Sequence, residues 1–328
     1  MLTWPVLVAL VLGMPLAAQD AGSFGALALS ETPTPLLAGH LTLQLPAGAV
    51  VQARSDGIMA APQPEASETR VVIDVGDMRM VLMADELFRS APEDLVAAVE
   101  SYAAPLRETH APLAVEAQRA SEGLRTVVVR PGSVDITEKA VPLAWIFVAQ
   151  GDGLLQQLAF YVNPAGAQDL PSARDLVSRI VATLRPGTQH AAPASRSEDL
   201  GGEGTRTLRI ELPADMGFVR QQGVDFVVHH MPVIVPLGQE GGSLGIYAGS
   251  APDKPDETAT RRGALLLEHT VQWLLSEQKQ GDVSAWVAEV QLPHPIHEDQ
   301  ILHVFINAST PELRDRLMKV AGTLSVKE

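Results

Sequence analysis

RDLVSRIVATL (residues 174–184) and RDRLMKVAGTL (residues 314–324) are two stretches of one chain that begin with the same pair of residues and end with the same pair. In each stretch the apolar residues recur three or four positions apart, which is the spacing of a helix with one buried side. A strand-like run precedes each stretch: LAFYVN (158–163) in the first half and LHVFIN (302–307) in the second. We therefore predict that each half of the chain closes with a strand, a short turn and an amphipathic helix.

The starts of these two helices also have recognisable signals. Ser309 and Glu312 have the spacing of a capping box, and Pro311 stands where a first-turn proline is tolerated. Pro171 and Ser172 open the first helix in a similar way.

Further matches precede the closing helices. VPLAWIFVAQ (141–150) corresponds to DVSAWVAEVQ (282–291), and both contain an Ala-Trp pair that we interpret as core. A turn follows each run, so each is predicted to form a hairpin with the strand before the closing helix. LTLQLPAG (41–48) and LRIELPAD (208–215) alternate in polarity, which predicts antiparallel strands with one buried face.

Each half is also predicted to contain a middle helix. The first has capping-box residues Ser90 and Glu93, and the second ends before Gly281, a C-terminal cap. The apolar positions at helical spacing are Leu95, Val99, Tyr102 and Leu106 in the first half, and Leu267, Val271, Leu274 and Leu275 in the second.

The chain therefore reads as a diverged tandem duplication of the α+β class, in which each domain is an antiparallel sheet with helices packed on it. The expected boundaries are a signal peptide at 1–18, a flexible segment at 19–37, domain 1 at 38–185, a linker at 186–206 and domain 2 at 207–328.

This order of elements resembles the Mog1/PsbP-like superfamily, which includes exported bacterial proteins of the DcrB type. The resemblance covers residues 41–185 and 207–326 and rests on the Leu-Pro turns and the two closing helices. It implies antiparallel sheets with packed helices, and members that mostly bind proteins or stabilise assemblies. The resemblance supplies no catalytic residue that could be carried over to this chain.

The first residues indicate export. An apolar stretch from Val6 to Leu12 and the small residues Ala17 and Ala18 are typical of a cleaved secretory signal, and the stretch is too short to span a bilayer of about 30 Å. The chain has no cysteine, so it forms no disulfides, and a bacterial periplasmic or secreted location is expected. After cleavage no transmembrane anchor is expected. The net charge of −15 argues against a nucleic-acid partner.

Two groups of residues have the composition of enzyme sites. Residues 241–245 match the G-x-S-x-G pattern around Ser243, but a turn precedes the serine and a strand follows it, the reverse of a nucleophile elbow. His229, His230, His294, His297 and His303 are candidate zinc ligands. His229 and His230 are neighbours on a strand and face opposite sides, and His303 lies about 10 Å along its strand from the loop that carries His294 and His297. We therefore assign no catalytic, cofactor-binding or metal-binding residue.

Two further groups were weighed. The carboxylates Asp74, Asp77, Asp85 and Glu86 pair with no His or Arg at a spacing that indicates a site, and an acidic solvated surface is expected. Met78, Met80 and Met83 are either core residues or an adaptable groove for a partner.

The sequence thus favours a non-catalytic, exported protein that binds another envelope protein or maintains the envelope. Two alternatives stay open. One is a hydrolase or metal-dependent enzyme whose site assembles only in the fold, and the other is a carrier of a small ligand or lipid, which requires a sizeable apolar cavity.

Overall fold

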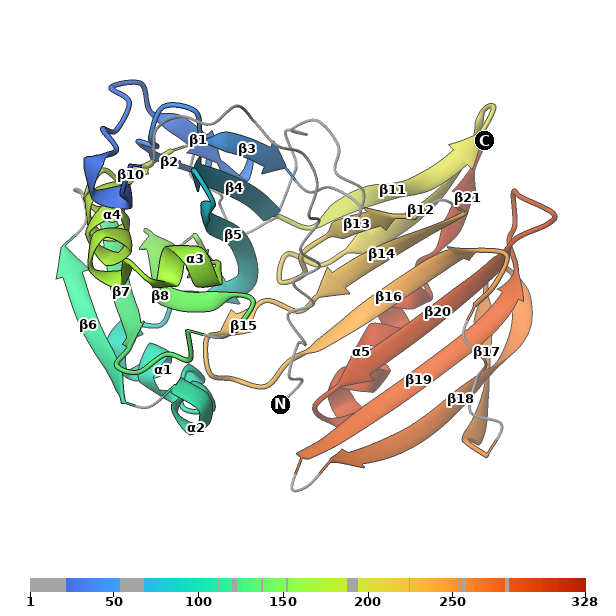
Figure 1. The fold of residues 1–328 in the computed structure, drawn as a ribbon. Helices are drawn as coiled ribbons and strands as arrows, with labels where there is room; N and C mark the ends of the chain where they lie inside the picture. The colour runs from blue at the N-terminus through green and yellow to red at the C-terminus, as the bar shows by residue number, and fades with distance from the viewer. Residues whose placement is uncertain are drawn as a thin grey trace. The chain divides into compact units, whose positions relative to one another are not determined.

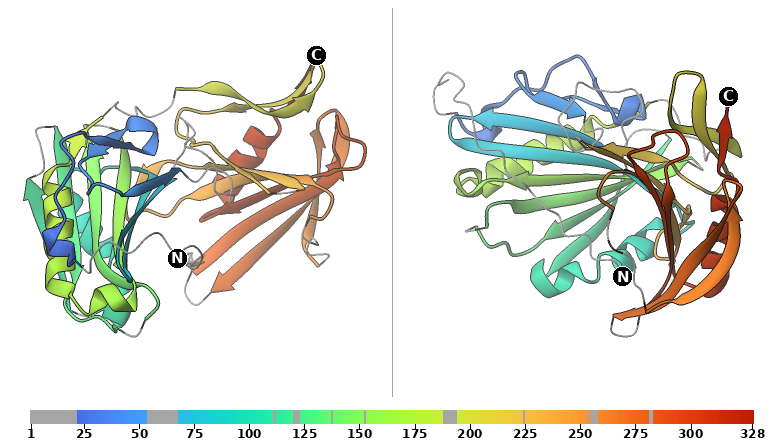
Figure 2. Two further views of the ribbon diagram at one scale, coloured as in Figure 1. Left: turned by 45° about the horizontal axis from the view of Figure 1, so that its top comes forward. Right: turned by 90° about the vertical axis from the view of Figure 1, so that its right-hand side faces the viewer.

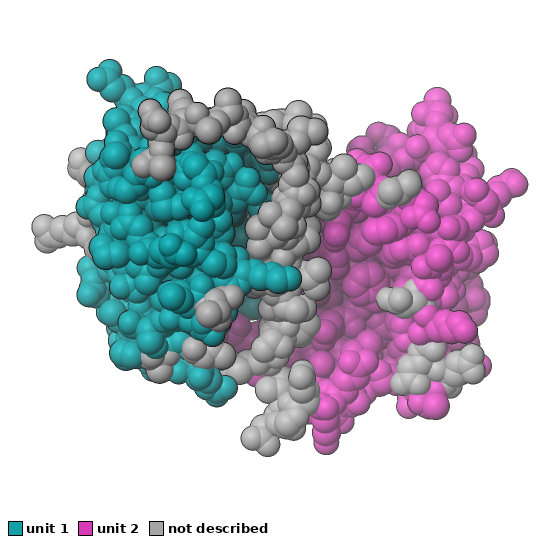
Figure 3. Space-filling model, in the orientation of Figure 1, with its two compact units in different colours: residues 1–54, 59–191 teal, residues 55–58, 192–328 magenta. Residues whose placement is uncertain are grey.

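The computed structural model describes residues 22–328 except 54–67, 111, 120–122, 137, 152, 188–193, 224, 253, 255–257 and 281–282. The chain divides into two compact units, shown in different colours in Figure 3. Unit 1 contains the described residues up to 187, and unit 2 contains those from 194 onward. The expected signal peptide, residues 1–18, lies outside the described residues.

The fold is mostly β, with 53% of the described residues in strands and 18% in helices, and these strands form four sheets (Figure 1). The predicted α+β class is therefore wrong. One cause is the middle helix expected around Leu267–Leu275, because His269–Gln280 forms a strand, β18. In that strand Val271, Trp273 and Leu275 are buried, and their spacing of two residues is that of a strand with one buried face.

Unit 1 is built around one large antiparallel sheet with the strand order β3-β4-β5-β9-β8-β7-β6. A small sheet of order β1-β2-β10 accompanies it. The elements are η1 (Phe24–Ala26), β1 (Thr34–Leu36), η2 (Leu37–Gly39), β2 (Leu41–Leu43), β3 (Val50–Ala53), β4 (Glu68–Val75), β5 (Met78–Ser90), α1 (Leu95–Tyr102), α2 (Leu106–His110), β6 (Leu113–Arg119), β7 (Leu124–Pro131), β8 (Val141–Gln150), β9 (Leu154–Val162), α3 (Pro164–Ala167), α4 (Leu170–Ala182) and β10 (Arg185–Pro186).

Unit 2 repeats this plan with a large antiparallel sheet of order β13-β14-β16-β20-β19-β18-β17 and a small sheet of order β11-β12-β21. If the strands of each large sheet are numbered along the chain, both sheets have the order 1-2-3-7-6-5-4. The elements are β11 (Arg196–Glu203), β12 (Arg206–Leu212), β13 (Val219–Gln222), β14 (Phe226–Pro232), β15 (Val235–Pro236), β16 (Gly242–Gly249), β17 (Thr260–Leu266), β18 (His269–Gln280), β19 (Val283–Pro293), β20 (Ile301–Ala308), α5 (Pro311–Ala321) and β21 (Ser325–Lys327).

The closing helices α4 and α5 occupy corresponding places in the two units. Helix α4 lies against β8, and α5 lies against β16, β19 and β20 (Figures 1 and 2). Each helix buries one apolar side in the core of its own unit, through Leu176 and Ile180 in α4 and through Leu317 and Val320 in α5. The predicted closing helices and the strands before them, β9 and β20, are confirmed.

The threonine that follows each closing helix makes the same pair of hydrogen bonds in both units. The hydroxyl of Thr183 donates to the carbonyl of Ile180 (2.6 Å) and accepts from the backbone N–H of Gln44 (2.9 Å). Thr323 does the same with Val320 (2.7 Å) and Glu211 (3.0 Å). Gln44 and Glu211 stand at the same position of the two Leu-Pro segments, so the similarity in sequence extends to a specific contact.

The helix caps differ in detail from the prediction. The N-cap of α1 is Asp94, whose carboxylate accepts from the N–H of Ala97, and that of α5 is Thr310, whose hydroxyl accepts from Leu313. Leu106, expected in the same helix as Leu95, starts the separate helix α2.

Two segments expected to lack regular structure contain ordered elements. Residues 196–203, in the second half of the expected linker, form β11, which pairs along its length with β12. In the segment 19–37, the Phe24 side chain is fully buried in the core of unit 1, and β1 pairs with β2.

Candidate functional site

The serine of the G-x-S-x-G pattern lies inside a strand. Ser243 is on β16, opposite Pro232 of β14 and Asn307 of β20, and no helix follows it directly. A side chain at Gly245 would overlap the ring of Phe305 on the next strand, so this glycine is explained by packing. Ser243 therefore lies within a strand and not in the strand-to-helix turn of a nucleophile elbow.

The five candidate zinc ligands do not converge on one point, although the ring centroids of His294 and His297 lie 4.8 Å apart. Among the described residues no group of three or more His, Asp or Glu side chains could hold a metal ion. His229 is buried, donates from Nε2 to the carbonyl of Leu200 (2.9 Å) and stacks on Phe218. His230 faces the other way and packs edge-on against Phe305. His303, on the same strand as Phe305, pairs with Glu289 at 3.1 Å.

The expectation that the carboxylates lack basic partners is wrong for two of them. Asp74 and Arg79 lie opposite each other on the β4–β5 hairpin and form a two-pronged ion pair at 2.6 and 3.0 Å. Glu86, which is buried, lies 3.4 Å from Nδ1 of His40. Both pairs join elements within unit 1 and indicate a structural role.

The methionines on β5 belong mainly to the core. Met80 is fully buried in the core of unit 1 and Met78 packs partly against it. Met83 is half-buried on the opposite side of the strand. The core interpretation therefore fits Met80 and Met78.

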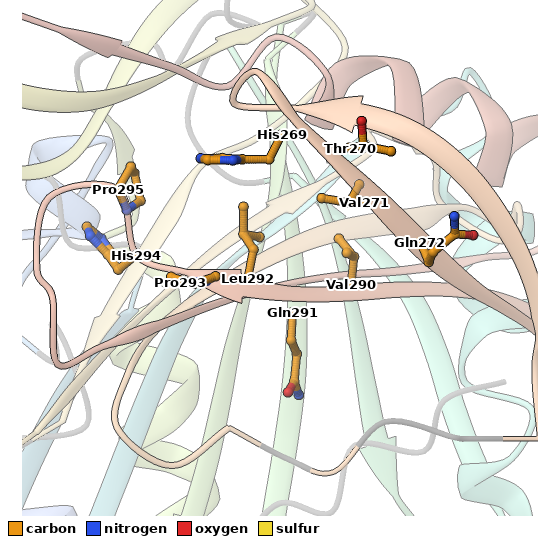
Figure 4. Close-up of a pocket in the computed structure, with 10 residues that line it drawn as sticks. All are labelled: His269, Thr270, Val271, Gln272, Val290, Gln291, Leu292, Pro293, His294 and Pro295. Carbon is orange, nitrogen blue, oxygen red and sulfur yellow. The ribbon is translucent and has the colours of Figure 1, made fainter.

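A cavity of about 530 Å³ lies in unit 2, where β18 and β19 meet the loop between β19 and β20 (Figure 4). Figure 4 shows Val271, Val290 and Leu292 on one side of the two strands, while Gln291 points to the other. The lining residues are His269, Thr270, Val271, Gln272, Val290, Gln291, Leu292, Pro293, His294 and Pro295, and they include no Asp, Glu, Lys or Arg. Sequence reasoning missed this site because it placed a helix where β18 runs.

His294 is the most constrained polar side chain of the cavity. Its Nδ1 accepts hydrogen bonds from the backbone N–H groups of Ile296 and His297, both at 3.1 Å, so its proton is on Nε2. Burial, together with the adjacent ring of His297, lowers the pKa of His294 to about 4. At neutral pH the side chain is therefore an uncharged donor.

The second feature with a functional implication is the edge strand β17. It pairs with β18 on one side and ends the large sheet of unit 2. Leu265 is 71% exposed, the most exposed large apolar side chain among the described residues. On the core side of the strand, Arg262 pairs with Asp315 of α5 at 3.0 Å.

Comparisons with known proteins do not identify a family for this chain. No family model matches the sequence, and no curated protein matches it. Two solved structures align over 87% of this chain and 87% of their own: MucB in complex with MucA(peri), at 12% identity and a TM-score of 0.18, and the Pseudomonas aeruginosa MucA/MucB complex, at 11% and 0.17. At these scores neither likeness bears on fold or function, and the resemblance to Mog1/PsbP-like domains stays a prediction. No helix in the described ranges is long and apolar enough to cross a membrane.

Proposed function

We propose that this protein is a non-catalytic binding protein of the cell envelope, and that it attaches another protein by adding an extended segment of that partner to β17. The observation that carries the proposal is that, among the described residues, β17 is the last strand of its sheet and pairs on one side only. An edge strand presents unpaired N–H and C=O groups along one side, and proteins use such edges to bind extended segments of others.

The length and exposure of β17 suit this role. It has seven residues, compared with four in β13 at the opposite edge of the same sheet. Every residue of β17 except Ala264 and Leu266 is exposed. A segment of similar length could therefore pair along the whole strand.

The side chains of β17 indicate what the segment would contain. Arg262, Ala264 and Leu266 point to the core side, where α5 lies, so Arg261, Gly263 and Leu265 share the outer face. A segment paired with β17 would place its own side chains beside Leu265 and Arg261. An apolar residue beside Leu265 and a carboxylate beside Arg261 would complement this face.

The direct test is photo-crosslinking in the native cell, with a photoreactive amino acid at position 265 of the full chain. We expect one defined protein adduct from position 265 and none from Ile136, a control in unit 1 whose side chain is 49% exposed. Adducts of the same pattern from both positions, or from neither, would refute the proposal.

A pair of proline substitutions separates binding from folding. Neighbouring residues of a strand direct their backbone N–H groups to opposite sides. One of the variants Gly263→Pro and Ala264→Pro therefore removes a hydrogen bond to β18, and the other removes an N–H group from the outer edge of β17. The variant that loses the outer N–H group should keep the stability of the protein and lose the adduct at position 265. If the variant with unchanged stability still forms the adduct, pairing along β17 is not the mode of binding.

The envelope location is part of the proposal and rests on the signal-like residues 1–18. N-terminal sequencing of the protein recovered from the envelope fraction should begin at Gln19. Recovery of the chain from the cytoplasm with its first residues intact would refute this part.

A further inference from the structure

Gly263 is a glycine that the fold of unit 2 does not require. It lies in the middle of the edge strand β17, is exposed, and stands opposite Gln272 of β18. Among the described residues, the only atom beyond its chain neighbours that a Cβ at this position would meet is Nε2 of Gln272, at 3.5 Å, which is an ordinary contact. Its φ lies outside the left-handed region that favours glycine. Neither crowding nor backbone conformation therefore explains this glycine.

The glycines of the central strand β16 show the contrast. A Cβ at Gly245 would lie 2.1 Å from the ring of Phe305, and one at Gly249 would lie 2.5 Å from the hydroxyl of Tyr247. These glycines make room for neighbours within the chain. A glycine inside a strand weakens the strand, and it often marks a place where a ligand or another backbone approaches closely. No described residue occupies the space above Gly263, so a bound partner is the remaining source of a close neighbour.

The residues on either side of Gly263 indicate what this neighbour would be. Arg261 and Leu265 lie two positions before and after it on the outer face of β17, and both are exposed. The missing side chain leaves a gap between them, and an aromatic ring is wide enough to contact both at once. Contact with Leu265 removes hydrocarbon surface from water, and the guanidinium of Arg261 is attracted to the face of a ring. An aromatic residue placed beside an edge glycine is also a known way of stabilising a sheet.

We propose that the partner segment bound at β17 carries an aromatic residue opposite Gly263, whose ring fills the gap between Arg261 and Leu265. This inference rests on the proposed function and names the partner residue that the edge strand selects. Side chains on one face of a strand are two positions apart, so the complementary residues fall into a short pattern. An antiparallel segment has an apolar residue, the aromatic residue and an acidic residue at alternate positions, and a parallel segment has them in the reverse order.

The first test measures peptide binding to the purified full chain by fluorescence anisotropy. The probes are the labelled peptide Thr-Leu-Thr-Trp-Thr-Glu-Thr, the peptide of reversed order Thr-Glu-Thr-Trp-Thr-Leu-Thr, and the counterpart of each with Ala in place of Trp. In one of the two orders we expect the Trp peptide to bind about tenfold more tightly than its Ala counterpart, because a buried aromatic anchor supplies much of the affinity of such contacts. Equal affinities within both pairs, or no binding of either Trp peptide, would refute the inference.

The second test fills the gap. Gly263→Val adds a branched side chain that strands favour, so the variant should keep or raise the free energy of unfolding measured in urea. It should weaken binding of the Trp peptide by about tenfold and abolish the adduct formed from position 265 in cells. Gln221→Val is the matched control, because it adds the same side chain at an exposed position of β13, the opposite edge of the sheet. The control should leave stability, peptide binding and the adduct unchanged.

The outcomes separate this inference from the proposed function. An adduct at position 265 that survives Gly263→Val would refute the aromatic contact and leave partner binding at β17 in place. If the parent chain forms no adduct, the proposed function fails, and the peptide affinities still decide what the gap at Gly263 accepts. A loss of stability in Gly263→Val would show that the fold itself requires the glycine, which would also refute the inference.

Discussion

His229 should make unit 2 less stable in mild acid. Its ring is 1% exposed, stacks on Phe218 and donates through Nε2 to the Leu200 carbonyl, while its Nδ1 is buried without a hydrogen-bond partner in the described part of the chain. A second proton would have to go on that buried Nδ1. Burial therefore lowers the pKa of His229 to about 4, and the hydrogen bond to Leu200 offsets only part of this effect.

The sign and size of the effect follow from proton linkage. The pKa is about 4 in the folded protein and about 6.5 in an unfolded chain, so between these values the unfolded state binds more protons. Stability therefore falls as the pH falls through this window. From pH 7 to pH 5 the contribution of His229 to the free energy of unfolding should decrease by about 2 kcal/mol.

The assay is urea unfolding at pH 7 and pH 5, followed by tryptophan fluorescence in a chain with Trp4 and Trp145 replaced by Phe, so that the signal comes from unit 2. His229→Gln keeps an N–H donor but has no group that binds a proton in this pH range. Between pH 7 and pH 5 the free energy of unfolding of this variant should therefore fall by about 2 kcal/mol less than that of the parent chain. His269→Gln, at an exposed position, is the control and should behave like the parent. An identical pH dependence in parent and His229→Gln would refute the reasoning, as would a pKa above 6 for His229 in an NMR titration.

Three further predictions concern stability. Thr323→Val removes the hydroxyl that joins α5 to β12 and should lower the free energy of unfolding of unit 2 by about 1–2 kcal/mol, and Thr183→Val should do the same to unit 1, as measured by urea unfolding. Gly245→Ala should cost roughly 1–3 kcal/mol through overlap with Phe305, and a second change, Phe305→Leu, should recover part of the loss, which a double-mutant cycle would detect. Asp74→Asn breaks a partly exposed ion pair and should lower the free energy of unfolding by less than about 1 kcal/mol. A larger loss would show that the ion pair contributes more to stability than a partly exposed pair should.

The parts of the fold that could be predicted are those in which the apolar residues recur at one spacing, either that of a helix or that of a strand. The closing helices carry a clear helical period together with a proline near the start, and the strands before them are short, apolar and bounded by turns. Around β18 two periodicities of apolar residues compete, since Leu267, Val271 and Leu274 have helical spacing while Val271, Trp273 and Leu275 have the spacing of a strand. The paired neighbours β17 and β19 decide in favour of the strand, and they are not local information.

The candidate sites were harder to predict because tertiary contacts create them. The cavity combines two strands and a loop, and its lining residues form no motif in the sequence. The Asp74–Arg79 pair was within reach, because Gly76 and Asp77 are the turn of a tight hairpin that sets the two residues opposite each other. Leu265 stands out only in the structure, because its exposure depends on β17 being the last strand of its sheet among the described residues.

The threonine contacts bear on how the chain is made. Thr183 binds Gln44, which directly follows β2 and lies 139 positions earlier, and Thr323 binds Glu211 of β12, 112 positions earlier. Each unit thus joins an early segment of its chain to the end of its last helix. Contacts between such distant residues form late, because most of the intervening chain must first be in place. During synthesis or export from the N-terminus, neither unit can complete its fold until its closing helix has emerged. Until then the unit exposes incomplete sheets, and a chaperone that holds the chain would act in this interval.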